Sequence, residues 1–346
     1  MTQPRLDVLA IGNAIVDVIT DADDAFLADQ GLDKGSMRLI DADEAERLYA
    51  LMAPGKEASG GSAGNTAAGL AALGLRAGFI GQVADDQLGA IYRHDITAQG
   101  VEFLVDPRGD VGATARCLIL VTSDAQRTMN TFLGAAQMLR SDAIDPAAIA
   151  DAAILYLEGY LWDPAEPRAA MEAAIDAARA AGRKVAFTLS DTFCVDRHRA
   201  DFHRLIDEGR IDILFANEAE LAAMTGTDDF DDGVTELSAK VPVLVVTRGS
   251  QGAIAVAGNE RATVPAEPVA QLVDTTGAGD LFAAGFLAGQ ARGLGLEPSL
   301  KLGAIAAAEV ISHYGARPEA DLRVLTDGLL KRNPLPPEWE GTTQRS

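Results

Sequence analysis

Cysteine is scarce in this sequence. Cys117 and Cys194 are the 2 cysteines of 346 residues, they lie far apart, and no Cys-x-x-Cys motif is present. Two distant thiols cannot build the disulfide framework of a small secreted domain, so we expect reduced thiols in a cytoplasmic protein. Histidine is scarce as well, and the 4 residues show no metal-binding spacing: His94, His198, His203 and His313. These absences argue against disulfide-stabilised and zinc-binding folds.

Long apolar runs and an excess of positive charge are also missing. No segment reaches the ~18 apolar residues that a membrane-spanning helix needs, and no basic region followed by an apolar run opens the chain. Asp and Glu number 51 against 29 Lys and Arg, a formal net charge of −22. This acidity argues against nucleic acid or a membrane as partner. It does not exclude ATP, because a local anion site with Mg²⁺ can work inside an acidic protein.

The most informative stretch runs from Val273 to Phe286 and reads Val-Asp-Thr-Thr-Gly-Ala-Gly-Asp-Leu-Phe-Ala-Ala-Gly-Phe. Its threonines and glycines suit a tight turn, and the apolar residues after them predict a helix. The N–H groups of Gly277, Ala278 and Gly279 would then point out of the helix start, where phosphate or another anion binds. Asp280 is suited to take a proton from an attacking hydroxyl. The same pattern also suits a helix start whose aspartate only favours the N-terminus.

Two other phosphate-binding motifs are excluded. A dinucleotide-binding fingerprint needs Gly or Ala at its sixth position, where this chain has Phe282. A Walker loop needs Gly-Lys-Ser/Thr, and the Gly55-Lys56 pair is followed by Glu57. The sequence therefore predicts neither a dehydrogenase nor a P-loop enzyme.

The stretch Asp-Thr-Thr-Gly-Ala-Gly-Asp closely resembles the C-terminal signature of the ribokinase-type (PfkB) sugar and nucleoside kinases. The resemblance implies that the amides of Gly277, Ala278 and Gly279 form an anion hole for the transferred phosphoryl group of ATP. It also implies that Asp280 is the base for the substrate hydroxyl. It spans about residues 7–330 and is supported by further local matches.

The alternation of elements fits this family. Apolar runs such as 7–12 and 154–157 predict buried parallel strands, and Ala-rich segments such as 164–181 predict helices between them. We expect a single α/β domain over residues 1–346, ribokinase-like, with a central, mostly parallel sheet and helices on both faces. A small β-sheet lid is expected from strands at about 14–20, 34–41 and 101–134, including a hairpin at 114–132. The tail 333–346 is expected to be loose.

A second Gly-rich segment, around residues 59–74, matches the family's first signature. The resemblance implies that Gly60, Gly61 and Asn65 bind the substrate's sugar hydroxyls, with help from Asn13 and Asp17. Read from the residues alone, the glycines also fit close helix–sheet packing, and Asp17 also fits a turn cap.

Other matches concern ATP and metal ions. Asn217 and Glu220 resemble the family's Asn-x-x-Glu motif, which organises Mg²⁺ through water; alone, the pair would suit a capped surface helix. The implied ATP-binding residues are Asn217, Thr247, Gly249, Gly252, Gly277, Gly279 and Ala308. Asp274, Thr276 and Gly315 resemble the family's monovalent-cation site, which would hold K⁺.

Several stretches, such as Leu157-Glu158-Gly159-Tyr160, are similar to the adenosine kinase subgroup. The resemblance implies transfer to the adenosine 5′-hydroxyl, with Phe193 stacking on the base and Met37 and Cys117 lining its pocket. Phe193 also suits a core position after a strand. A kinase for a free sugar such as ribose, fructose or 2-keto-3-deoxygluconate is the alternative, and a catalytically silent binding protein is an alternative from another class. The family contains monomers and homodimers.

Overall fold

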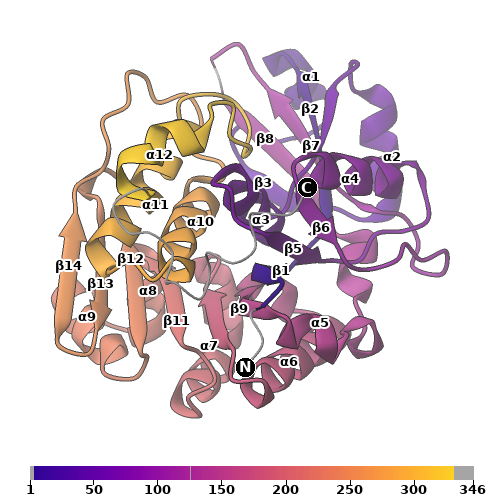
Figure 1. The fold of residues 1–346 in the computed structure, drawn as a ribbon. Helices are drawn as coiled ribbons and strands as arrows, with labels where there is room; N and C mark the ends of the chain where they lie inside the picture. The colour runs from indigo at the N-terminus through magenta and orange to yellow at the C-terminus, as the bar shows by residue number, and fades with distance from the viewer. Residues whose placement is uncertain (1–3, 125, 331–346) are drawn as a thin grey trace.

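The computed structural model describes residues 4–124 and 126–330, and a nine-stranded sheet forms its centre (Figure 1). The strand order is β14-β13-β12-β11-β10-β9-β1-β5-β6, with parallel pairing from β6 to β12 and antiparallel pairing from β12 to β14. The strands are β1 (Leu6–Ile11), β5 (Ala77–Ile80), β6 (Val101–Phe103), β9 (Ala152–Glu158), β10 (Lys184–Thr188), β11 (Ile213–Asn217), β12 (Val243–Thr247), β13 (Ala253–Ala257) and β14 (Glu260–Val264).

Helices cover both faces of this sheet, because its central strands carry apolar side chains on both sides. All residues of β1 are buried, with Val8 and Ala10 in one hydrophobic cluster and Leu9 and Ile11 in another. The first cluster lies under α3 (Ser62–Ala72), α4 (Gln87–Ala98), α10 (Ala278–Ala291), α11 (Leu296–Val310) and α12 (Leu322–Leu330). The second lies under α5 (Pro146–Ala150), α6 (Ala165–Ala180), α7 (Thr192–Asp207), α8 (Glu218–Thr225) and α9 (Phe230–Ser238). The predicted α/β layering is confirmed.

A second sheet of five strands, called the lid sheet below, stands beside the large one (Figure 1). Its order is β3-β8-β7-β2-β4, made of β2 (Ile15–Asp21), β3 (Met37–Leu39), β4 (Lys56–Ser59), β7 (Ala115–Val121) and β8 (Arg127–Phe132). The helices α1 (Asp24–Asp29) and α2 (Ala42–Leu51) connect its strands. The expected lid range 101–134 begins instead with β6, which pairs with β5 in the large sheet, and β4 is a lid strand that the sequence did not predict.

Strand register decides which lid residues share a face, since paired residues of neighbouring strands point to the same side. Asp17 pairs with Cys117, Cys117 with Thr131, and Val121 with Arg127. On the opposite face, Val16, Val18, Leu118 and Leu120 are buried in the hydrophobic cluster. One lid face is therefore committed to packing, and Asp17 and Arg127 stand on the other.

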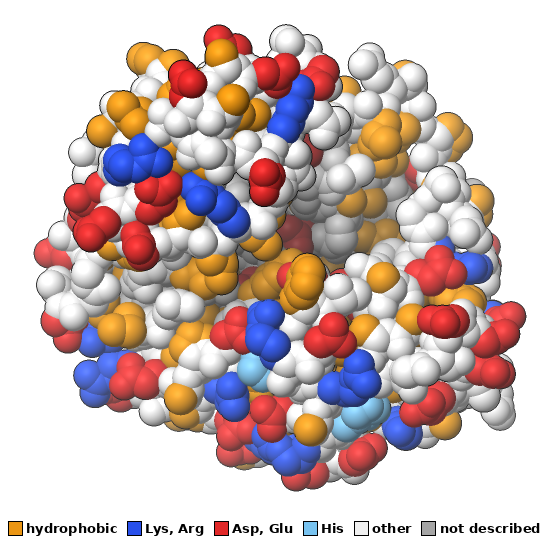
Figure 2. Space-filling view, turned by 180° about the vertical axis from the view of Figure 1, so that it is seen from behind, with side chains coloured by type: hydrophobic (Ala, Val, Ile, Leu, Met, Phe, Trp, Pro, Cys, Tyr) orange, Lys and Arg blue, Asp and Glu red, His pale blue; other side chains and the backbone are white. Residues whose placement is uncertain are grey.

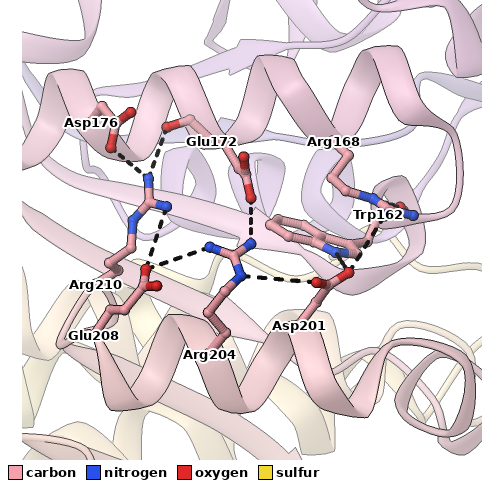
Figure 3. A network of polar contacts seen from close by, with 8 residues as sticks. All are labelled: Trp162, Arg168, Glu172, Asp176, Asp201, Arg204, Glu208 and Arg210. Atoms are coloured by element: carbon pink, nitrogen blue, oxygen red, sulfur yellow. Dashed lines mark hydrogen bonds and ion pairs between the residues drawn. The ribbon is translucent and has the colours of Figure 1, made fainter.

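A network of charged side chains joins α6 to α7, two helices that cover the same face of the large sheet (Figure 3). Arg204 of α7 donates to Glu172 of α6 at 2.5 Å and lies 3.9 Å from Asp201. Asp201 also accepts the indole N–H of the fully buried Trp162 at 3.1 Å. Trp162 ends the short 3-10 helix Gly159–Trp162 that follows β9, so the network anchors the chain directly after that strand.

Side-chain caps fix where helices begin. α7 begins at Thr192, because Asp191 accepts the N–H of Cys194 at 2.6 Å. The remaining 3-10 helices are Gly134–Met138, Ser141–Ala143 and Gly249–Gln251. In the described ranges no helix is both long and apolar enough to cross a membrane. The tail 333–346 lies outside the described residues.

Candidate active site

Two pockets meet at the carboxyl ends of the parallel strands, the edge at which open α/β sheets bind ligands. A cleft of about 450 Å³ is lined by Thr188, Asn217 and Thr247 at the ends of β10, β11 and β12, and by Asp280. A second pocket of about 420 Å³ opens on the other side of the segment that starts α10. The two share five lining residues: Thr247, Thr275, Ala278, Gly279 and Phe282. The face shown in Figure 2 is hollowed near its centre, with hydrophobic and acidic side chains around the hollow.

The turn between the pockets is built around Gly277. This residue is the N-cap of α10 with a φ of +78°, and a Cβ here would lie 2.6 Å from that of Ala316. Only glycine fits both conditions. The N–H of Ala278 donates to the carbonyl of Thr275 at 3.2 Å, which closes the turn. The amides of Gly277 and Gly279 find no such backbone acceptor in the described part of the chain, so they are the donors best placed for an anion.

Asp280 lies in the first turn of α10 and faces the start of α3. Its Oδ1 accepts the hydroxyl of Ser62 at 2.6 Å, and its Oδ2 accepts the amide of Asn65 at 2.8 Å. Burial raises the pKa of Asp280, opposed by these two hydrogen bonds and by the charge of Arg317. Both donors leave lone pairs free on the carboxylate, which can receive a proton from a hydroxyl in the cleft.

The predicted hydroxyl-binding residues also come together. A Cβ on Gly60 would lie 2.4 Å from the carboxylate of Asp17, and one on Gly61, whose φ is +83°, would lie 2.1 Å from the carbonyl oxygen of Asn13. Both glycines are therefore required for this close approach. Burial raises the pKa of Asp17 to about 6, against the lowering effect of Arg317 and Arg127.

Glu158 is a site residue that the sequence reasoning did not single out. It is fully buried at the carboxyl end of β9 and accepts three N–H groups: Asn13 N at 2.7 Å, Asn13 Nδ2 at 2.8 Å and Ala63 N at 2.7 Å. Burial raises the pKa of Glu158 to about 7. The carboxylate thus ties the loop after β1 to the start of α3. Its sequence signals were a charge at the end of an apolar run and its place in a stretch similar to the adenosine kinase subgroup, and neither gave it a role.

Arg317 is a second missed residue, and no local motif announces it. Its guanidinium donates to the carbonyls of Ser59 and Gly64 at 2.8 and 2.6 Å. Its positive charge lowers the pKa values of Asp17 and Asp280, both of which burial raises. Arg317 therefore holds the turn at Gly60 and Gly61 in place, and its positive charge stabilises the ionised forms of Asp17 and Asp280.

Asn217 and Glu220 form a reciprocal helix cap at the edge of the cleft. Asn217 Oδ1 accepts the N–H of Glu220 at 2.8 Å, and Glu220 Oε2 accepts the N–H of Asn217 at 2.9 Å. Burial raises the pKa of Glu220 to about 7. The described residues contain no group of three or more acidic, His or Cys side chains that could hold a metal directly. One carboxylate and one amide beside the cleft fit a Mg²⁺ ion held through water and substrate phosphates.

The second pocket contains most of the predicted ATP-binding residues. Thr247, Gly249, Gly252, Gly279 and Ala308 all line it, together with apolar residues that include Leu272 and Ile311. Asn217 and Gly277 line the first cleft instead. The apolar walls suit a flat heteroaromatic ring, and the shared turn lies where a phosphate chain would run between the two pockets.

Phe193 is not brought to the site. Because α7 begins at Thr192, Phe193 falls in its first turn, is 69% exposed, and lines neither pocket. Tyr160, which the sequence reasoning did not select, lines the cleft. Asp274, Thr276 and Gly315 do come together, but a guanidinium from the lid sheet joins them, as described below.

Comparison with known families gives one match that covers most of the chain. The model of the "pfkB family carbohydrate kinase" matches residues 35–322. This range includes the Gly-Gly turn, the Asn217–Glu220 pair and the turn with Asp280, but not Asn13 and Asp17.

Solved structures and characterised relatives agree with this match. The adenosine kinase from Sinorhizobium meliloti is 49% identical and covers 94% of this chain and 99% of its own, with a TM-score of 0.87. A probable sugar kinase from Rhizobium etli CFN 42 is 47% identical and covers 94% and 100%, with a TM-score of 0.88. A fructokinase from Klebsiella pneumoniae is 31% identical over 67% of this chain and 76% of that protein.

Proposed function

Because the chain belongs to the pfkB family of carbohydrate kinases, it is a phosphotransferase that acts on hydroxyl groups, and we propose that its acceptor is the 5′-hydroxyl of adenosine. Kinases of this family use ATP, typically with Mg²⁺. The observation that carries the proposal is the position of Asp280 beside the turn where a polar cleft and an apolar pocket meet. Such an arrangement suits an acceptor and a nucleotide that approach one phosphoryl group from opposite sides.

In the proposed reaction, the acceptor oxygen bonds to the γ-phosphorus while the bond from phosphorus to the β,γ-bridging oxygen breaks. ADP leaves with the electron pair of that bond, and the hydroxyl proton moves to the carboxylate of Asp280. Charge builds on the phosphoryl oxygens, and the amides of Gly277 and Gly279 stabilise it. Ser62 and Asn65 hold the carboxylate of Asp280 in place throughout.

Asn217 and Glu220 would position a Mg²⁺ ion through its waters, and that ion would neutralise the phosphates of ATP. The adenine of ATP would lie between Leu272 on one side and Ala308 of α11 and Ile311, the residue after that helix, on the other, because these residues give the second pocket its apolar walls. Thr247, Gly249 and Gly252 border the same pocket, where small residues allow a nucleotide to approach the backbone closely.

Two observations support a ribose-containing acceptor. Asn65 of α3 donates to Asp280, and Asp17 stands on the lid face that also carries Arg127; we expect these two polar residues to bind the vicinal 2′- and 3′-hydroxyls. Met37 and Leu39 are exposed apolar residues of β3. They pair with Met129 and Thr131 and therefore share a face with Asp17. Contact with a nucleobase would remove these two apolar side chains from water, which is favourable. The 49% identity to an adenosine kinase supports the same acceptor.

A free sugar is the second candidate, because Asp17, Gly61 and Asn65 would serve any vicinal diol. The fructokinase and the probable sugar kinase among the relatives favour it.

The exposed position of Phe193 also removes the base-stacking residue that the sequence had suggested. The cleft residue Tyr160 is the aromatic ring that we propose in its place, because it lines the cleft.

The test is ADP release from Mg·ATP with adenosine, other nucleosides, ribose, fructose and 2-keto-3-deoxygluconate as acceptors. We expect a strong preference for adenosine, and ADP release by Asp280→Asn that is slower by about 10²–10⁴ with any acceptor. Turnover of a free sugar with adenosine inert would reject the adenosine proposal and leave the role of Asp280 standing. Adenosine binding without ADP release would show that this chain has lost the family's activity.

A further inference from the structure

A buried ion pair joins the lid sheet to the segment that precedes the phosphate-binding turn. Nη1 of Arg127, at the start of β8, lies 2.7 Å from Oδ2 of Asp274, and the side chains are only 8% and 6% exposed. Among the described residues, Asp274 is the only carboxylate in ion-pair contact with Arg127. Cζ of Arg127 lies 5.4 Å from the centre of the Tyr314 ring, and the two groups form a cation–π contact.

Asp274 connects three segments through its two oxygens. Oδ1 accepts the N–H and the hydroxyl of Thr276, at 3.1 and 2.8 Å. Oδ2 accepts the N–H of Gly315 at 3.1 Å and is the oxygen that pairs with the guanidinium of Arg127. Arg127 Nη1 also donates to the hydroxyl of Thr276 at 3.2 Å. The conformation of residues 275–279 therefore depends on a carboxylate whose charge Arg127 balances.

The same residues were expected to hold K⁺, and the arrangement does not fit that ion. A monovalent cation needs oxygen lone pairs, whereas Oδ1 of Asp274 already accepts two hydrogen bonds, and Oδ2 accepts one and forms the ion pair with Arg127. A cation at Asp274 would also stand beside the positive charge of Arg127, which a nearly buried environment screens poorly. The positive charge that this position requires is already supplied by the chain itself.

We propose that Arg127 takes the place of a monovalent cation: its guanidinium neutralises Asp274 and holds the turn 275–279 ready for the phosphoryl group, so the enzyme does not need K⁺. Arg127 belongs to the lid sheet, so displacement of the lid removes the charge from the turn. A dissolved ion would give no such coupling between the lid and the anion site. Arg127 is thus a positioning residue that acts through Asp274 and Thr276.

The inference rests on phosphoryl transfer, not on adenosine as acceptor, so it is tested with whichever acceptor gives ADP release. The first measurement compares the unmodified enzyme in KCl and in tetramethylammonium chloride at the same ionic strength of about 0.1 M. We expect kcat to agree within about twofold. An activation by K⁺ of tenfold or more would overturn the proposal without any variant.

The second measurement uses Arg127→Met, which removes the charge and keeps an unbranched side chain. We expect kcat to fall by about a hundredfold, as for the loss of one preorganised electrostatic contact, and K⁺ but not tetramethylammonium to restore at least tenfold of it. Arg127→Lys should keep most activity and remain insensitive to K⁺. A loss of activity that K⁺ cannot restore, with the fold intact, would make the ion pair merely structural and reject the proposal.

Two controls keep the result interpretable. Arg38→Met removes a lid charge from the opposite face, where Arg38 binds Asn130 and Glu44, and it should change neither kcat nor the response to K⁺. Thermal unfolding is the readout independent of activity: K⁺ should raise the Tm of Arg127→Met and leave that of the unmodified enzyme unchanged. Equal shifts in both proteins would contradict the proposal even if Arg127→Met were inactive for other reasons.

Discussion

Asp280 is held by two donors that tolerate the loss of its charge. Ser62 can donate to an amide oxygen as it does to the carboxylate, and Asn65 has a buried Oδ1 without a hydrogen-bond partner in the described chain. In Asp280→Asn, rotation of the Asn65 amide would present that oxygen to the new N–H₂ group. We therefore expect an intact fold, with kcat lower by about 10²–10⁴, the usual contribution of a positioned base. Circular dichroism checks that the fold is intact, and steady-state kinetics measure kcat. A kcat within tenfold of the unmodified enzyme would reject Asp280 as the base.

The acidic limb of the pH profile should report Asp17. Burial raises its pKa to about 6, so the carboxylate is ionised above this pH and protonated below it. The protonated form accepts fewer hydrogen bonds from substrate hydroxyls, and kcat/KM should therefore fall about tenfold per pH unit as the pH drops below about 6. In Asp17→Asn the plateau should be lower, and the limb that remains belongs to Asp280. An identical limb in that variant would assign it to another buried acid, such as Glu158 or Glu220.

Two glycines at the start of α10, Gly277 and Gly279, are needed for different reasons. Gly277 has a φ of +78° and would clash with Ala316 if it carried a Cβ, whereas a Cβ on Gly279 would have nothing of the protein within 4 Å. We expect Gly277→Ala to lower stability by about 1–3 kcal/mol through backbone strain and to impair catalysis. Gly279→Ala should leave stability unchanged or slightly higher.

Activity should still fall in Gly279→Ala, because Gly279 lines both pockets and a methyl group there would crowd the phosphate chain. Thermal unfolding and the KM for ATP, measured on both variants, separate the two effects. Equal losses of Tm in both variants, together with an unchanged KM for ATP, would show that the turn is needed for folding and not for nucleotide binding.

The sequence predicts contiguous elements well and distant side-chain contacts poorly. The turn 275–279 could be recognised because all of its determinants lie in one short stretch, and the hairpin of β7 and β8 because both strands flank a polar turn. Glu158 could not be found in this way, because it acts on Asn13 and Ala63, 145 and 95 residues away. Arg127 donates to Thr276 across 149 residues, and local spacing gives no hint of the pair. Phe193 failed for a local reason, since the cap at Asp191 starts α7 early enough to leave the ring exposed.

In the whole molecule, buried carboxylates and surface carboxylates both make the folded state less stable as the pH rises. Burial raises the pKa values of Asp17, Glu158 and Glu220 to about 6, 7 and 7. The folded chain therefore binds more protons than the unfolded chain between about pH 4 and 7, and its stability is lost as the pH rises through the folded-state pKa values. In addition, Asp and Glu number 51 against 29 Lys and Arg, and the resulting net charge of −22 produces repulsion between surface charges. Exposed ion pairs such as Arg261–Asp231 oppose this repulsion only weakly.

We expect the free energy of unfolding to be higher at about pH 5.5 than at pH 8, by an amount on the order of a few kcal/mol. Chemical denaturation at both pH values, each at about 0.01 and 0.15 M salt, separates the two causes, since the Debye length falls from about 30 to 8 Å over this range. Surface repulsion is screened by salt, so the higher salt should stabilise the protein most at pH 8. The contribution of the three buried carboxylates is screened little and should persist as a remaining pH dependence. If that dependence vanished completely in salt, repulsion alone would explain it, and the three carboxylates would not carry raised pKa values in the folded enzyme.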